Sequence, residues 1–171
     1  MNVFSLGKYK AIVIALGAFV GLIAGVMALN FMISTQLADD AVGINVAGRQ
    51  RMLTQRLVKD LSNVQALAQR GEDLTASLKQ LQQNAHLFDT TLKAFRDGGQ
   101  ATGSKANQVS LDKSTSETGR RTLDETIKLW TPFKNLIDEA VAEPPDTAWL
   151  NDLVKAIDYG RRHNVELLSL M

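Results

Sequence analysis

Residues 11–33 form one uninterrupted apolar segment, and it limits what this chain can fold into. The segment reads AIVIALGAFVGLIAGVMALNFMI, 23 residues without a charge. At about 1.5 Å per residue, a helix of this length spans roughly 35 Å, which is enough to cross a bilayer core of about 30 Å. The sequence therefore predicts a transmembrane helix over 11–33.

The charges beside this segment predict its orientation. Lys8 and Lys10 precede it, whereas Asp39 and Asp40 follow it. The positive-inside rule then places residues 1–10 in the cytoplasm and the rest of the chain on the other side of the membrane. A cleavable signal peptide is the alternative, but the apolar segment is longer than a signal h-region of roughly 7 to 15 residues, and no convincing A-x-A site follows.

Three glycines within the apolar segment favour close helix packing. Gly17, Gly21 and Gly25 lie four residues apart and therefore share one helix face. This spacing suggests a parallel dimer in the membrane. Glycine is also simply common in membrane helices, and that reading stays open.

The rest of the chain has helical periodicity. A first helix continues from the membrane to Gly71, with one apolar stripe, and a second helix ends at Gly98 and Gly99. The stripe of the first helix consists of Leu53, Leu57, Leu61, Val64 and Ala68. Residues 98–115 are small and polar, so we expect a mobile loop there.

Two further helices complete the predicted domain. Ser114 and Glu117 have capping-box spacing at the start of the third helix. Pro144 and Pro145 force a turn, after which Asp146 can cap the fourth helix. The predicted fold is all-α: an N-terminal transmembrane helix that continues into an up-down-up-down antiparallel four-helix bundle over 34–171. Trp130 and Trp149 are expected in its core or at its ends.

The fourth predicted helix is shorter than the first. Counting residues places its end about level with residue 46, and no second apolar span follows. The expectation is either the N-terminal part of a longer receptor or a protein with a single span.

Composition excludes several functions. The chain has 171 residues, a net charge of only +1 and no cysteine, so we expect no nucleic-acid partner, no disulfide and no thiolate metal site. His86 and His163 lie far apart, which argues against a metal site, and we expect no cofactor. No nucleophile with a base can be recognised, so we predict no catalytic residues and no enzyme activity.

The positive charges of the chain are concentrated after the apolar segment. Residues 41–59, AVGINVAGRQRMLTQRLVK, carry four positive charges and no acid. Within them a second set of residues alternates at spacings of three and four, which is the a/d pattern of a coiled coil and indicates a second buried face for a partner subunit. The set is Ile44, Ala47, Arg51, Thr54, Val58 and Leu61.

Arg51 is the central residue of this second face. A two-fold axis along the face would bring Arg51 opposite its own copy, and no acid on the same helix is placed to neutralise it. A small planar anion between two guanidinium groups would compensate the repulsion. Arg56 can pair with Asp60 and is expected to be structural, whereas Arg49 is expected in solvent or at the pocket rim. A merely solvated basic face is the alternative.

One segment also resembles a known family. Residues 44–56, INVAGRQRMLTQR, closely resemble the motif of the PilJ/NarX-type sensor domain, the N-terminal domain of type IV pili methyl-accepting chemotaxis transducers and of nitrate-responsive kinases. A weaker similarity covers residues 162–168. The resemblance implies a periplasmic four-helix bundle of a receptor in the bacterial inner membrane, which dimerises through its first helix.

The resemblance also implies a ligand and its site. Nitrate or nitrite would bind at the homodimer interface between two copies of Arg51. The ligand-binding residues it implies are Arg51, Gly48, Ala47, Asn45 and Gln55. Family members return through a second span to an output module that this sequence does not contain. Some are linked to type IV pilus signalling, so an interaction module that contacts an envelope protein is the alternative.

Overall fold

The computed structural model describes residues 3–103, 107–142 and 147–171, without the side chains of 3–8, 39, 147 and 148. The chain divides into two compact units, Met1–Ala41 and Val42–Met171, and each is described by itself. The predicted cap at Asp146 and the turn at Pro144 and Pro145 lie outside the described residues.

The first unit consists of helix alone. Helix α1 runs from Val3 to Arg70, and its N-terminal part includes the apolar segment 11–33. Among the described residues, α1 is the one helix long and apolar enough to cross a membrane, and its most apolar window has no buried part. A side-chain surface of this kind suits lipid rather than water. The helix predicted over 11–33 is therefore confirmed, and its insertion in a membrane stays a prediction.

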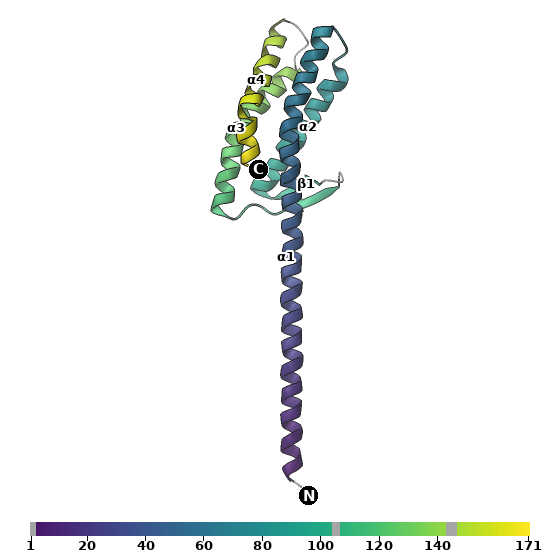
Figure 1. Ribbon diagram of the computed structural model, residues 1–171, viewed down its shortest axis with the longest axis vertical. Coiled ribbons are helices and arrows are strands. Elements are labelled where there is room, and N and C mark those ends of the chain that lie inside the picture. The colour runs from purple at the N-terminus through teal and green to yellow at the C-terminus, as the bar shows by residue number, and fades with distance from the viewer. Residues whose placement is uncertain (1–2, 104–106, 143–146) are drawn as a thin grey trace. The chain divides into compact units, whose positions relative to one another are not determined.

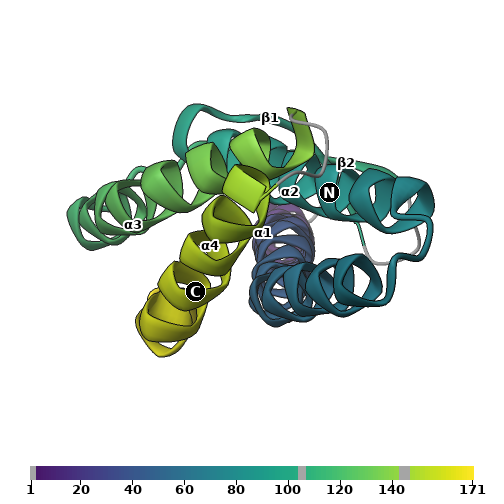
Figure 2. The same ribbon diagram turned by 90° about the horizontal axis from the view of Figure 1, so that it is seen from above.

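The second unit is a four-helix bundle, as the periodicity predicts (Figure 1). The end of α1 is followed by α2 (Thr75–Asp97), α3 (Glu117–Ala142) and α4 (Thr147–Ser169), and successive helices run in alternating directions. Figure 2 shows the same four helices from above. The all-α fold with an up-down-up-down order is confirmed.

A main apolar core holds the four helices together. The predicted stripe of α1 supplies Leu53, Leu57, Leu61 and Val64, which are fully or almost fully buried. Phe88 of α2 packs on Trp130 of α3, with ring centroids 4.2 Å apart. Both tryptophans lie in this core as expected, and Trp149 Nε1 donates a hydrogen bond of 2.7 Å to the carbonyl of Ala140.

Gly71 ends α1 in a conformation that favours glycine. Its φ is +66°, and its N–H bonds the carbonyl of Ala68 while the N–H of Glu72 bonds that of Leu67. These two bonds form a Schellman motif, which satisfies carbonyl groups at the helix end. The chain then turns directly into α2.

The capping residue of α3 differs from the prediction. Ser116, rather than Ser114, accepts a hydrogen bond of 3.0 Å from the N–H of Gly119. The reason is that α3 begins at Glu117, so Ser116 is the residue immediately before the helix.

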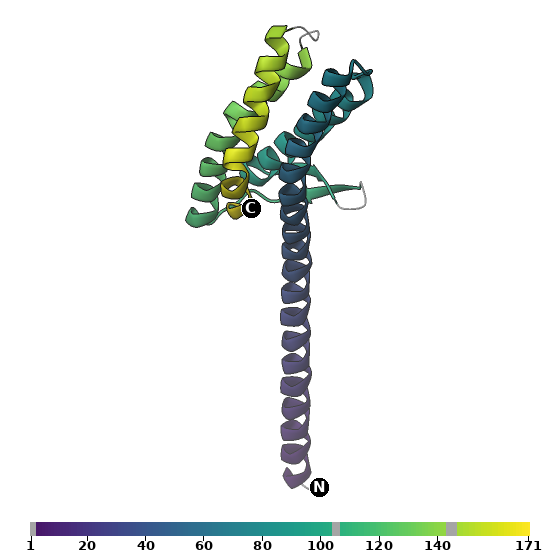
Figure 3. The ribbon, with the colours of Figure 1, turned by 45° about the horizontal axis from the view of Figure 1, so that its top comes forward.

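The composition of residues 98–115 predicts a mobile loop, but the structure has two short strands in this segment. They are β1 (Gly99–Thr102) and β2 (Gln108–Leu111), which pair antiparallel (Figure 3). Ala101 and Leu111 are buried in a small second cluster with Val46 of α1. The hairpin forms because these few apolar residues meet a complementary patch at the end of the bundle, which the local sequence does not reveal.

The end of α4 lies where the residue count predicts. Leu170 and Met171 border the same cavity as Ala47 and Gln50 of α1. The fourth helix therefore ends about level with residues 47–50, close to the expected residue 46.

Asp89 links α2 to α3 and makes the stability of the bundle depend on pH. Its carboxylate accepts hydrogen bonds from Trp130 Nε1 at 3.0 Å and from Lys93 Nζ at 2.7 Å. Burial alone raises the pKa of Asp89, but the bonds from Lys93 and Trp130 outweigh it, so the pKa lies below its ordinary value. This stabilisation is present above the unfolded-state pKa and is lost as pH falls through the folded-state pKa.

We expect Asp89→Asn to unfold at a lower temperature than the wild type at pH 7. Since only the wild type loses stability by protonation of residue 89, the difference should shrink as pH falls below about 4, the ordinary pKa of aspartate. Circular dichroism melts of both proteins across this range measure the difference. Asp138→Asn is the control, because Asp138 is exposed and its ion pair, within the described residues, is with Lys134 of the same helix. A difference that is constant with pH would contradict the assignment.

Candidate functional site

The bundle part of α1 has an exposed face opposite its core stripe. We call it the outer face. It consists of Ile44, Asn45, Gly48, Arg51, Met52, Gln55 and Arg56, all of them exposed. The face arises because Leu53, Leu57 and Leu61 turn to the core, so the residues between them at helical spacing point away from it.

Arg51 is an exposed cation near the middle of the outer face. Within the part of the chain that the structure describes, its guanidinium makes no hydrogen bond and no ion pair. The neighbours one helical turn away on this face, Gly48 and Gln55, bear no charge. The five N–H donors of Arg51 are therefore directed to solvent and open to an external acceptor.

The outer face is partly apolar around this cation. Ile44 is 74% exposed and Met52 is 51% exposed. Gly48 leaves open space, since a Cβ at this position would meet no atom within 4 Å. A cation between exposed apolar side chains and an open glycine differs from the uniformly charged surface typical of a solvated helix.

Four of the predicted site residues share the outer face, and one does not. Asn45, Gly48, Arg51 and Gln55 are exposed on it. Ala47 is half-buried at its edge and faces a cavity inside the bundle. The side chains that share the outer face can contact one external ligand or a second copy of the helix.

The predicted second apolar face is shorter than its a/d pattern suggests. Thr54 and Leu61 are buried within the bundle, and Val58 packs against the core. The reason is that α4 covers this side of α1: a Cβ on Gly160 would lie 3.0 Å from Val58 Cγ2. Only the part near Ile44 and Arg51 remains open to a partner.

Two other arginines have different roles from those predicted. Arg49 Nη1 donates hydrogen bonds to the carbonyls of Thr102 and Gly103, so it holds the hairpin instead of lying in solvent. Arg56 makes no ion pair within the described residues. Its expected partner Asp60 instead accepts a hydrogen bond from Asn84 Nδ2 of α2. Asp60 therefore contacts α2 through Asn84 rather than pairing with Arg56.

The comparison with known families identifies the domain to which this face belongs. Residues 32–157 match the PilJ family, described as type IV pili methyl-accepting chemotaxis transducer N-term. The chain belongs to this family. The match extends over the bundle part of α1, over α2 and α3 and into α4, and it confirms the resemblance seen in residues 44–56. No curated protein and no solved structure matches the chain.

Membership in the PilJ family defines the general role of the domain. The chain is the sensory domain of a methyl-accepting chemotaxis transducer, and the family is not catalytic. We therefore look for a surface that can bind a ligand or a partner protein. Among the described residues, the outer face of this PilJ domain offers two arginines without an ion pair, Arg51 and Arg56, and Arg51 is the one that lies a helical turn from the open Gly48.

Sequence reasoning missed a second polar feature of the PilJ domain. Gln50, between the two arginines of the motif, is only 2% exposed, and its Nε2 donates a 2.9 Å hydrogen bond to the carbonyl of Phe88. A signal was present, because Gln50 precedes Leu53 and Leu57 by three and seven residues and so shares their core stripe. The helical spacing predicts a buried amide at this position.

Proposed function

We propose that this sensory domain binds nitrate or nitrite between the Arg51 side chains of two chains that meet through their outer faces. The observation that carries the proposal is the exposed, unpaired guanidinium of Arg51 among apolar side chains and an open glycine. A planar oxyanion fits because guanidinium is a planar donor with two or more parallel N–H groups.

In a two-fold symmetric dimer, the bound anion would stabilise the contact between the two chains. Two outer faces that approach each other would bury Ile44 and Met52, which favours association. The same approach would bring two Arg51 cations together and remove water from them, which opposes association. A bound anion offsets this opposition, so ligand binding and dimer formation support each other.

Glycines along α1 support close contact between two chains. Gly48 has no side chain and meets open space, so a second helix can approach the backbone. Gly17, Gly21 and Gly25 have the same property in the first unit, since a Cβ at each would meet nothing within 4 Å. Small residues four apart are a common contact between membrane helices.

The proposed location follows from the charges beside the apolar helix. Residues 11–33 would anchor the chain in the bacterial inner membrane, with Lys8 and Lys10 on the cytoplasmic side. The bundle would then lie in the periplasm, where it meets small anions before they enter the cell.

The second candidate function is recognition of an envelope protein. The family description itself names type IV pili, and the exposed side chains of Ile44 and Met52 would also suit a protein partner. In this case Arg51 would contact an acidic or carbonyl group of that partner rather than a free anion.

Calorimetry of the full chain in detergent, with nitrate, nitrite and sulfate, separates these functions. We expect heat and saturation with nitrate or nitrite and much weaker binding of sulfate, since a dianion loses more hydration than a monoanion when it is enclosed between two helices. Light scattering in parallel should show a larger dimer fraction with nitrate. Dimeric protein that gives no heat with any of the three anions would reject the anion site and favour the protein partner.

A further inference from the structure

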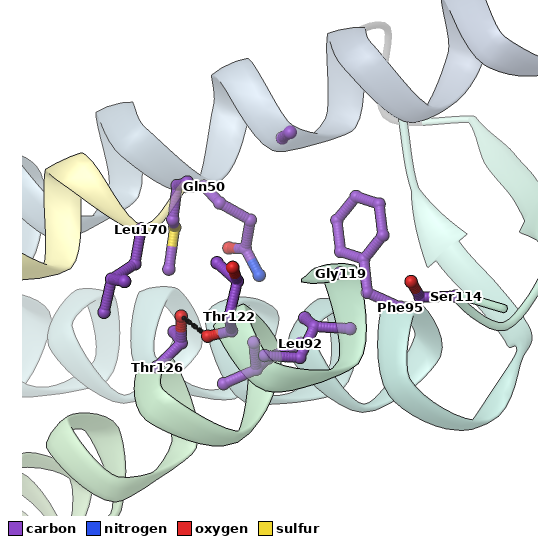
Figure 4. Close-up of a pocket in the computed structure, with 11 residues that line it drawn as sticks. Gln50, Leu92, Phe95, Ser114, Gly119, Thr122, Thr126 and Leu170 are labelled. Atoms are coloured by element: carbon purple, nitrogen blue, oxygen red, sulfur yellow. Dashed lines mark hydrogen bonds between the residues drawn. The ribbon is translucent and has the colours of Figure 1, made fainter. Parts of the chain in front are cut away.

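A cavity of about 260 Å³, partly open to solvent, lies between α1, α2, α3 and the end of α4 (Figure 4). Leu92 and Phe95 of α2, Leu123 of α3 and Leu170 at the end of α4 supply apolar walls. An engineered cavity of about 150 Å³ is enough to bind benzene, so this one is large enough for a substituted ring.

Gln50 places a hydrogen-bond acceptor without a partner in the wall of the cavity. Figure 4 shows its amide directed from α1 into the space between the helices. Gln50 is 2% exposed, and within the described residues no donor reaches its buried Oε1. An unsatisfied buried carbonyl oxygen is costly, and a donor brought by a ligand would remove that cost.

The orientation of this amide follows from its other contact. Gln50 Nε2 lies 2.9 Å from the carbonyl oxygen of Phe88, and only the nitrogen of an amide can donate to a carbonyl. Exchange of the two amide atoms would place two acceptors against each other. The acceptor Oε1 is therefore the atom left for the cavity.

The remaining polar groups indicate a neutral ligand. None of the side chains that line the cavity carries a charge. Apart from Gln50, the polar side chains in the lining are the hydroxyls of Ser114, Thr122 and Thr126, and the hydroxyl of Thr126 already donates to the carbonyl of Thr122 at 2.8 Å. An ion would lose its hydration without a compensating partner in such a space, whereas an apolar molecule with a single donor would not.

We propose that this cavity is a second ligand site, which binds a small neutral molecule, mainly apolar, through one donor group to Gln50 Oε1. A phenol is the simplest molecule of this class. The site is separate from the proposed anion site, because Gln50 is buried in the bundle whereas Arg51 is exposed on the outer face. The proposal does not depend on the identity of the ligand at Arg51.

Fluorine NMR of the full chain in lipid nanodiscs tests the site with two probes, 4-fluorophenol and fluorobenzene. Both fit the apolar walls, but only the phenol can donate to Gln50. After subtraction of binding to nanodiscs without protein, we expect saturable binding of both, with the phenol about tenfold tighter. Equal affinity, or no saturable binding of either probe because water fills the cavity, would overturn the proposal.

Two variants locate the binding. Gln50→Met keeps the length of the side chain and removes the acceptor, so the preference for the phenol should disappear. Leu123→Phe extends a ring into the cavity and should abolish binding of both probes. Circular dichroism checks that each variant is folded, and binding by Leu123→Phe at wild-type affinity would also reject the site. If either variant fails to fold, the comparison of the two probes on the wild type still decides.

Discussion

Replacement of Arg51 by alanine is expected to abolish nitrate binding. In the proposed dimer each anion accepts hydrogen bonds from two Arg51 side chains, so one substitution removes both. Hydrogen bonds to a charged group contribute about 1.5 to 3 kcal/mol each, and loss of two corresponds to at least a 100-fold weaker affinity. Calorimetry with the full chain in detergent measures this change directly.

The same substitution should make dimer formation independent of nitrate. Without the guanidinium groups, repulsion across the interface is removed while Ile44 and Met52 remain. Arg51→Ala should therefore form dimers to the same extent with and without nitrate, unlike the wild type. Light scattering at several protein concentrations, with and without nitrate, reports this behaviour.

Two controls define the role of Arg51. Arg51→Lys keeps the charge but loses the planar pair of donors, so we expect intermediate binding. Lys59→Ala removes an exposed cation two turns further along the same helix and should leave nitrate affinity unchanged. If Lys59→Ala weakened binding as much as Arg51→Ala, the effect would be general electrostatics, and the specific site would be rejected.

Gly160→Ala is expected to destabilise the bundle strongly for a change of one methyl group. A Cβ at this position would lie 2.8 Å from Phe133 Cζ and 3.0 Å from Val58 Cγ2. Phe133 is fully buried between Trp130 and Tyr159, so its ring has little room to move. Overpacking of this kind costs about 1 to 3 kcal/mol, which thermal unfolding followed by circular dichroism can measure.

Gly43→Ala is the matched control for this substitution. Gly43 also lies inside a helix, but a Cβ there would meet nothing within 4 Å. Alanine favours a helix over glycine by about 0.5 to 1 kcal/mol, so we expect this variant to be slightly more stable than the wild type. Equal effects of the two substitutions would show that α4 does not pack closely on α1 and α3 at Gly160.

The helices and their core could be predicted because apolar residues recur along the sequence at helical spacing. The spacing of Leu53, Leu57, Leu61 and Val64 identifies the buried stripe of α1 without any knowledge of its partners. The ends of α1 and α2 were marked by glycines whose backbone conformation suits a helix end. These signals lie within one helix and do not depend on the segments that pack against it.

The features that the sequence did not reveal depend on contacts between distant segments. Arg49 bonds to Thr102 and Gly103, more than fifty residues away, and Asp60 bonds to Asn84 on the neighbouring helix. The hairpin is stable only against α1 and α2, because its own strands contain few apolar residues. The second apolar face was predicted around Arg51, but its extent was overestimated, since the packing of α4 on Val58 depends on the tertiary structure.

Three consecutive residues of α1 serve three different surfaces. Arg49 holds the hairpin, Gln50 borders the cavity, and Arg51 is exposed on the outer face. Successive residues of a helix differ by about 100° in direction, so these assignments depend on the register of the chain. A substitution at one of these positions can alter one surface and spare the others. An insertion or deletion of one residue just before Arg49 would redirect all three side chains together, so evolution can vary this turn in composition far more freely than in length.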